Sequence, residues 1–227
     1  MNLQAIIFDF DGVIADSEPL HLRAFQHALA DNGIALTRDE YFARYLGYDD
    51  VGVFQAISRD RGLGMSERQV AALVTLKGIK LQQMMEAGDV VFPGAVEFIR
   101  AAAAVVPVAI ASGALRHEID EILEGAGLAG LFSTIVASGD TPESKPSPAP
   151  YRLAFERLRD TTGTALDASR CVAIEDSRWG LESAHGAGLR CVGVTNSYAA
   201  DELAPAELVT GGLHALTIEM LDDLVMK

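Results

Sequence analysis

Short apolar runs alternate with longer amphipathic stretches over most of the chain. The runs at 5–8, 107–111, 134–137, 171–174 and 190–194 are typical of strands buried on both faces of a parallel sheet. Between and after them, apolar residues recur at helical spacing, at 93–104, 115–124, 149–159, 177–187 and 218–225. The pattern predicts an α/β fold, a Rossmann-like parallel sheet with helices on both faces.

The segment between the first two predicted strands has a different hydrophobic pattern. Its apolar spacing is helical at 16–30, 38–45, 49–61 and 66–87, with glycines between these stretches and no strand pattern. We therefore predict two domains. Residues 1–15 and 90–227 form the Rossmann-like core, and residues 16–89 form an all-helical domain inserted after the first strand.

Charge and cysteine content restrict the partners of this chain. The formal net charge is −14, which disfavours nucleic acid and anionic membranes as partners because both are negatively charged. Cys171 and Cys191 lie in apolar strand runs and are expected to be reduced thiols. The apolar stretch at 101–111 is too short to span a bilayer. We expect a cytoplasmic monomer. The charge does not exclude a small phosphorylated substrate, provided that local cations and a metal offset the negative field.

Two aspartates, Asp9 and Asp11, directly follow the first predicted strand. If the strand stays extended through Asp11, its two-residue period directs both carboxylates to the same side. Such a pair is unfavourable to desolvate unless a cation shares it. The alternative is an ordinary acidic turn, since Asp11-Gly12 is also common turn chemistry.

Polar side chains also follow the other predicted strands. Each has an ordinary explanation: Ser112-Gly113 as a turn, Asp176 as a helix cap and Lys145 as a solvated loop charge. In an open parallel sheet, however, ligands bind where the strands end, so these positions meet at one edge. Carboxylates, a hydroxyl and a lysine are the groups that phosphoryl transfer needs. We therefore predict a phosphoryl-transfer site at this edge.

The same residues, in this order, resemble the motifs of the haloacid dehalogenase superfamily, in the branch of β-phosphoglucomutase and phosphoglycolate phosphatase. Four segments carry the resemblance: 8–13 (Phe-Asp-Phe-Asp-Gly-Val), 110–113 (Ile-Ala-Ser-Gly), 145–148 (Lys-Pro-Ser-Pro) and 174–177 (Ile-Glu-Asp-Ser) with Gly180. Further similarity at 16–21 and 92–94 extends it over almost the whole chain. The resemblance implies that the inserted helical domain is a cap.

The resemblance also implies roles for the residues of the first and last motifs. Asp9 corresponds to the nucleophile that forms an aspartyl-phosphate, and Asp11 to the general acid and base. Asp9, the backbone carbonyl of Asp11 and Asp176 would hold Mg²⁺, with Glu175 accepting hydrogen bonds from its waters.

The second and third motifs would bind the phosphate. Lys145 would offset the repulsion between Asp9 and an anionic phosphate. Ser112 and the backbone N–H groups of Gly113 and Ala114 would position its oxygens.

The phosphoryl acceptor depends on the helical domain. The mutases carry a Lys-Gly-x-Ser-Arg loop that holds a second phosphate, whereas this chain reads Leu-Gly-Tyr-Asp-Asp at 46–50. The cationic clamp is therefore missing, and Asp50 would repel a second phosphate, which favours water as the acceptor. Further candidate substrate contacts are His21, Gly47, Tyr48, Lys77 and Arg116.

We therefore expect a Mg²⁺-dependent phosphatase acting on a small phosphate monoester, a sugar phosphate, through an aspartyl-phosphate. A sugar-phosphate mutase is the alternative, in which Arg44 or Arg116 replaces the missing clamp. A more distant alternative is a non-enzymatic phospho-acceptor module. For Lys77 the alternative is a solvated helix charge, and for His21 a structural role.

Overall fold

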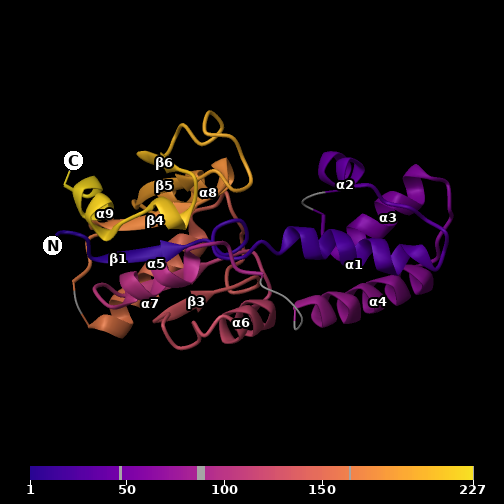
Figure 1. Ribbon diagram of the computed structural model, residues 1–227, viewed down its shortest axis with the longest axis horizontal. Coiled ribbons are helices and arrows are strands. Elements are labelled where there is room, and N and C mark those ends of the chain that lie inside the picture. Colours follow the sequence, from indigo (N-terminus) through magenta and orange to yellow (C-terminus); the bar gives the residue numbers. More distant parts are fainter. Residues whose placement is uncertain (46–47, 86–89, 164, 227) are drawn as a thin grey trace. The chain divides into compact units, whose positions relative to one another are not determined.

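The computed structural model describes residues 1–45, 48–85, 90–163 and 165–226 (Figure 1). The chain divides into two compact units. The core unit comprises Met1–Asp16 and Val90–Lys227, and the helical unit comprises Ser17–Asp89. Within the described residues, no helix is both long and apolar enough to cross a membrane.

The described part of the core unit contains a six-stranded sheet in the order β3-β2-β1-β4-β5-β6, with every neighbouring pair parallel (Figure 1). The strands are β1 (Ala5–Phe8), β2 (Val108–Ala111), β3 (Thr134–Val136), β4 (Cys171–Glu175), β5 (Arg190–Val194) and β6 (Leu208–Thr210). The predicted parallel sheet is confirmed. The strand β6 was not predicted, because its three residues are only half-buried and form no apolar run.

Helices cover both faces of this sheet, as predicted. They are α5 (Ala95–Ala103), α6 (Arg116–Gly125), α7 (Ala149–Thr162), α8 (Arg178–Gly186) and α9 (Ile218–Leu224). Tyr151 of α7 and Leu181 of α8 belong to one buried cluster with Ile7 of β1. Phe8, the next residue along β1, points to the opposite face, where its ring meets that of Phe98 of α5 at 6.2 Å.

The two connections to the helical unit begin side by side within the core unit. The Asp16 N–H donates to the Val90 carbonyl at 2.7 Å, and the Phe92 N–H donates to the Ile14 carbonyl at 2.9 Å. Because the chain departs and returns at neighbouring points, a whole domain is inserted after β1 without disturbing the sheet.

The helical unit contains α1 (Glu18–Ala30), α2 (Arg38–Arg44), α3 (Asp50–Asp60) and α4 (Glu67–Met85). All regular structure in its described part is helical, as the apolar spacing predicted. Its core is aromatic: the Phe25 ring lies 5.7 Å from that of Tyr41 and 5.2 Å from that of Phe54. These contacts hold α1, α2 and α3 together.

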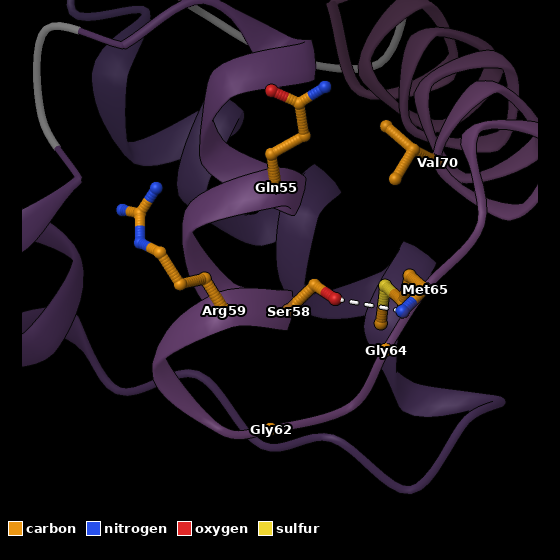
Figure 2. Close-up of a pocket in the computed structure, with 7 residues that line it drawn as sticks. All are labelled: Gln55, Ser58, Arg59, Gly62, Gly64, Met65 and Val70. Carbon is orange, nitrogen blue, oxygen red and sulfur yellow. Dashed lines mark hydrogen bonds between the residues drawn. The ribbon is translucent and has the colours of Figure 1, made fainter.

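The turn between α3 and α4 is fixed by a buried hydroxyl. Ser58 Oγ accepts a hydrogen bond from the Met65 N–H at 2.9 Å, beside a pocket of about 360 Å³ (Figure 2). The pocket is lined by Gln55, Ser58, Arg59, Gly62, Gly64, Met65 and Val70. The hydrogen bond sets the point at which the chain enters α4.

Lys77 of α4 ties three elements of the helical unit together. Its side chain is only 2% exposed, so the alternative of a solvated helix charge is wrong. Its Nζ lies 2.8 Å from Asp50 Oδ1, 3.0 Å from His21 Nδ1 and 5.0 Å from the centre of the Phe25 ring. Asp50 therefore neutralises the buried ammonium group of Lys77.

We predict that His21 makes the helical unit sensitive to acid. Burial and the charge of Lys77 lower the pKa of His21 to about 4, whereas an unfolded histidine titrates near 6.5. The neutral imidazole therefore stabilises the fold above pH 6.5, and this stability is lost as the pH falls towards 4. Urea denaturation should show a loss of about 2 kcal/mol between pH 8 and pH 5 from this group.

His21→Gln, which keeps a hydrogen-bond acceptor for Lys77, should show a smaller loss over the same range. His27→Gln, at an exposed position of the same helix, is the matched control and should behave like wild type. Equal pH dependence of wild type and His21→Gln would contradict the prediction.

A second prediction concerns the close packing of α8 on β4. A Cβ atom on Gly180 would lie 1.8 Å from the Glu175 side chain. Gly180→Ala should therefore destabilise the protein by about 3 kcal/mol or more, because a buried carboxylate must move. Gly78→Ala, in an exposed part of α4 with open space around it, should stabilise by up to about 1 kcal/mol. Thermal unfolding of both variants tests the contrast, which fails if the two shifts have the same sign.

Candidate active site

Three carboxylates meet at the carboxyl edge of the sheet. Phe8 of β1 is paired with Ile174 of β4, and the Asp9 N–H extends the ladder by donating to the Ile174 carbonyl at 2.9 Å. Asp9 therefore leaves its strand beside Glu175 and Asp176. One oxygen from each of these three carboxylates lies within 4.8 Å of the others, and all three residues are buried.

Lys145 joins this cluster from the loop that follows β3. Its Nζ donates to Asp9 Oδ1 and to Glu175 Oε1, both at 2.6 Å. The ammonium group also lies 4.8 Å from the centre of the Tyr151 ring, and the Tyr151 hydroxyl donates to Glu175 Oε1 at 2.9 Å. A partly buried cation thus bridges two carboxylates that come from adjacent strands.

The electrostatics of the cluster reflect an excess of negative charge. Burial, and then the charge of Glu175, raise the pKa of Asp9 well above its ordinary value against the influence of Lys145. The same two causes raise the pKa of Asp176. Burial alone would lower the pKa of Lys145, but the carboxylates of Asp9 and Glu175 hold it above the usual range. Lys145 therefore stays charged at neutral pH.

This donor set fits a hard divalent cation. Lys145 supplies one positive charge to three carboxylates, and burial together with the remaining repulsion raises the pKa of Asp9 and Asp176. A divalent ion among these oxygens would remove that repulsion. Mg²⁺ prefers oxygen ligands and is held by one or two carboxylates together with waters, so Asp9 and Asp176 are suitable ligands.

Ser112 lies at the end of β2, on the other side of β1 from β4. Its N–H donates to the Val136 carbonyl at 2.9 Å, and its buried Oγ accepts from the Ala114 N–H at 2.9 Å. The Ala114 carbonyl accepts from the Ser138 N–H at 2.9 Å. These bonds fix the turn through Gly113 at the same edge of the sheet as Asp9.

The backbone between Asp9 and Asp11 is not a continuation of the extended strand β1. The strand ends at Phe8 and the chain bends, with the Phe10 carbonyl accepting from the N–H groups of Ile14 and Ala15 at 2.8 and 2.9 Å. The premise of an extended chain through Asp11 is therefore wrong. Asp11 nevertheless contributes to the raised pKa of Asp176, after burial and Glu175, which places its carboxylate near the cluster.

Gly12 is required by this bend. Its φ is +79°, and a Cβ there would lie 1.8 Å from Asp176 Oδ2. A side chain at this position would therefore be strained in its backbone and would displace the Asp176 carboxylate.

Three residues that hold the cluster in place were not predicted from the sequence. Ser197 donates to Asp176, Asn196 Nδ2 donates to the Gly12 carbonyl at 2.7 Å, and Tyr151 donates to Glu175. Ser177, the last residue of the fourth motif, also donates from its Oγ to Glu175 Oε2 at 3.1 Å. The polar run that follows β5 was an available signal, because β5 ends at the same edge as β1 and β4.

The remaining candidates lie apart from the carboxylate cluster in the chain. His21 and Lys77 contact each other within the helical unit. Tyr48 is 54% exposed, and Gly47, with Leu46, lies outside the described residues. Arg116 of α6 is exposed, with its Nε 2.9 Å from both carboxylate oxygens of Asp120.

Known proteins share the fold and the motifs of this chain. The family model of the haloacid dehalogenase-like hydrolases matches residues 3–188, which include all four motifs. The protein CbbY of Rhodobacter capsulatus is 30% identical over 233 residues, covering 99% of this chain and 100% of CbbY. A phosphoglycolate phosphatase of Yersinia pseudotuberculosis is 28% identical over 198 residues, covering 86% of this chain and 82% of that protein.

A solved structure agrees with these relatives. A mutant of CbbY from Rhodobacter sphaeroides, crystallised with xylulose-(1,5)bisphosphate, has a TM-score of 0.78 at 27% identity, with 97% of this chain and 99% of that chain covered. The resemblance predicted from the motifs is confirmed: the chain belongs to the haloacid dehalogenase-like hydrolases, a family of enzymes.

Proposed function

We propose that this protein is a Mg²⁺-dependent phosphatase that hydrolyses a small phosphate monoester, a sugar phosphate, through an aspartyl-phosphate intermediate. The observation that carries the proposal is the bridge from Lys145 to Asp9 and Glu175 beside Asp176, at the edge where parallel sheets bind ligands. The names of the relatives add support, since one is a phosphoglycolate phosphatase and CbbY was crystallised with a sugar bisphosphate.

In the first half of the reaction, an oxygen of Asp9 attacks the phosphorus atom and the bond to the sugar oxygen breaks. Asp11 donates a proton to that oxygen, so the sugar leaves as a neutral alcohol. In the second half, Asp11 takes a proton from water, which attacks the phosphorus atom and releases phosphate from Asp9. Each half leaves Asp11 in the protonation state that the next half needs.

Other residues of the chain bind and orient the phosphate. Lys145 places a positive charge 2.6 Å from Asp9 Oδ1, which lowers the repulsion between this carboxylate and an anionic phosphate. Ser112 and the backbone N–H groups of Gly113 and Ala114 position the phosphate oxygens. Asp9, Asp176 and the Asp11 carbonyl would hold Mg²⁺, with Glu175 accepting hydrogen bonds from waters bound to the ion, and the ion would supply further charge neutralisation.

The ion pairs of three candidate cations favour water as the acceptor of the phosphoryl group. Lys77, which aligns with a cap lysine of the mutases, is neutralised by Asp50 at 2.8 Å. Arg44 and Arg116, the candidates for a replacement clamp, are paired with Asp60 and Asp120 at 2.8 and 2.9 Å. These pairings leave less free positive charge for a second phosphate. We also propose that the helical unit acts as the cap domain of this family, with His21, Gly47 and Tyr48 as its substrate contacts and Lys77 as a contact to a substrate hydroxyl rather than to a second phosphate.

We predict that Asp9→Asn abolishes phosphate release. A panel of sugar phosphates, assayed with and without Mg²⁺, should include at least one substrate that wild type hydrolyses only with the metal. Loss of the nucleophile should lower kcat by at least about a thousandfold. Asp160→Asn, which changes an exposed carboxylate of α7, is the control and should retain activity.

Undiminished turnover by Asp9→Asn, or no turnover of any panel member by wild type, would count against the phosphatase. Conversion of a hexose 1-phosphate into the 6-phosphate in the presence of a bisphosphate would show a mutase instead. An acyl-phosphate that persists for minutes would favour the phospho-acceptor module.

A further prediction concerns Tyr151 as a positioning residue. Tyr151→Phe removes the hydroxyl group that donates a hydrogen bond to Glu175 Oε1 in the buried cluster. The unfolding free energy should fall by about 1–3 kcal/mol, because Glu175 loses a buried partner, and kcat should fall more than KM rises. Tyr48→Phe, at an exposed position, should leave the unfolding free energy unchanged. Equal stability of Tyr151→Phe and wild type would refute this role.

A further inference from the structure

A second cluster of potential metal ligands lies at the opposite end of β5 from the catalytic edge. It comprises His185 near the end of α8, Cys191 near the start of β5 and Glu207 just before β6. One ligand atom from each residue lies within 4.8 Å of the other two. Three elements of the core unit thus bring an imidazole, a thiol and a carboxylate together.

The carboxylate of this cluster is held in a fixed position. Glu207 Oε2 lies 3.2 Å from His185 Nε2 and accepts from the Cys191 N–H at 2.8 Å. Arg190 Nη1 lies 3.5 Å from the other oxygen, Oε1. Glu207 is therefore oriented with one oxygen towards His185 and Cys191, and Arg190 balances part of its charge.

The Cys191 thiol is buried and weakly engaged. Within the described residues, its polar contacts are the carbonyl oxygens of Leu181 and Leu189, both 3.9 Å away. A thiol is a poor hydrogen-bond donor, and such distances hold it loosely. Its sulfur can therefore shift towards His185 and Glu207 without the loss of a strong interaction.

The geometry suits a tetrahedral ion of the zinc class. Bond lengths of about 2.0–2.1 Å to nitrogen and oxygen put two ligands of tetrahedral zinc about 3.3 Å apart. The observed separation of His185 Nε2 and Glu207 Oε2 is 3.2 Å. The sulfur lies within 4.8 Å, so a movement of about 1 Å completes a site with zinc-to-sulfur bonds of about 2.3 Å.

A neighbouring pocket reaches one member of the cluster, His185. His185 lines a pocket of about 470 Å³ together with Arg178, Trp179, Glu182 and Pro205. The pocket gives an ion a route to the imidazole, and it leaves room for water as a fourth ligand. Trp179, the only tryptophan of the chain, is 47% exposed in the same pocket and can report on binding.

We propose that His185, Cys191 and Glu207 form a second metal site, which binds Zn²⁺ or a similar divalent ion such as Co²⁺. On binding, the Cys191 thiol releases its proton to the solvent and a metal–sulfur bond forms. The neutral imidazole and the Glu207 carboxylate supply the other protein ligands, so thiolate and carboxylate together balance the charge of the ion. Mg²⁺ does not compete, because it prefers oxygen ligands. This site is independent of the proposed phosphatase activity.

Titration of the full-length protein with Co²⁺ tests the proposal. A thiolate ligand gives a charge-transfer absorption in the near ultraviolet, which wild type should develop and Cys191→Ser should lack. Cys171→Ser is the matched control, because Cys171 is also a free, buried cysteine on a neighbouring strand. It should retain the absorption, as should Asp176→Asn and wild type in excess Mg²⁺, since Co²⁺ at the carboxylate cluster gives no thiolate band.

His185→Gln, at a partly exposed position, carries the test even if Cys191→Ser does not fold. It should weaken Co²⁺ binding by more than about tenfold, a loss that even second-shell partners produce, with a matching loss of the Trp179 fluorescence change. The proposal is overturned if wild type shows no thiolate band. It is equally overturned if Cys191→Ser keeps the band or if His185→Gln binds Co²⁺ as wild type does.

Discussion

The partly buried ion pairs of Lys145 are the interaction on which the carboxylate cluster depends. Asp9, Glu175 and Asp176 converge because β1 and β4 are adjacent and in register, and burying three carboxylates together is strongly unfavourable unless cations offset them. Lys145 provides the protein's own share of that compensation at 2.6 Å from two of them. The loop after β3 therefore has to bring Lys145 to the same edge of the sheet as Asp9 and Glu175.

Two glycines pack so closely against the carboxylates that no side chain fits at either position. Gly12 and Gly180 both lie where a Cβ would come within 1.8 Å of a side chain of the cluster. One glycine allows the chain to bend after β1, and the other allows α8 to approach β4. Hydrogen bonds from Ser177, Ser197 and Tyr151 then fix the carboxylate oxygens. The arrangement of the site thus depends on its backbone as well as on its side chains.

The molecule uses buried charge in a similar way elsewhere. In the helical unit, Lys77 is paired with Asp50 and contacts His21, so the fold can bury an ammonium group among apolar helices. In the core unit, the two clusters of potential metal ligands differ in chemical hardness. The carboxylate cluster contains oxygen ligands suited to Mg²⁺, whereas His185 and Cys191 offer the nitrogen and sulfur that zinc-class ions prefer.

The sequence by itself determined the parallel sheet and the inserted helical segment, because apolar periodicity is a local signal, and strand-end position singled out Asp9, Ser112, Lys145 and Asp176 as candidates. It did not determine β6, the bend at Phe10 or the supporting roles of Tyr151 and Ser197. Burial of Lys77 was equally out of reach. These features depend on partners distant in sequence, such as Asp50 for Lys77 and Asp176 for Ser197. Only the tertiary structure brings such partners together, so it alone decides which polar residues are buried and paired.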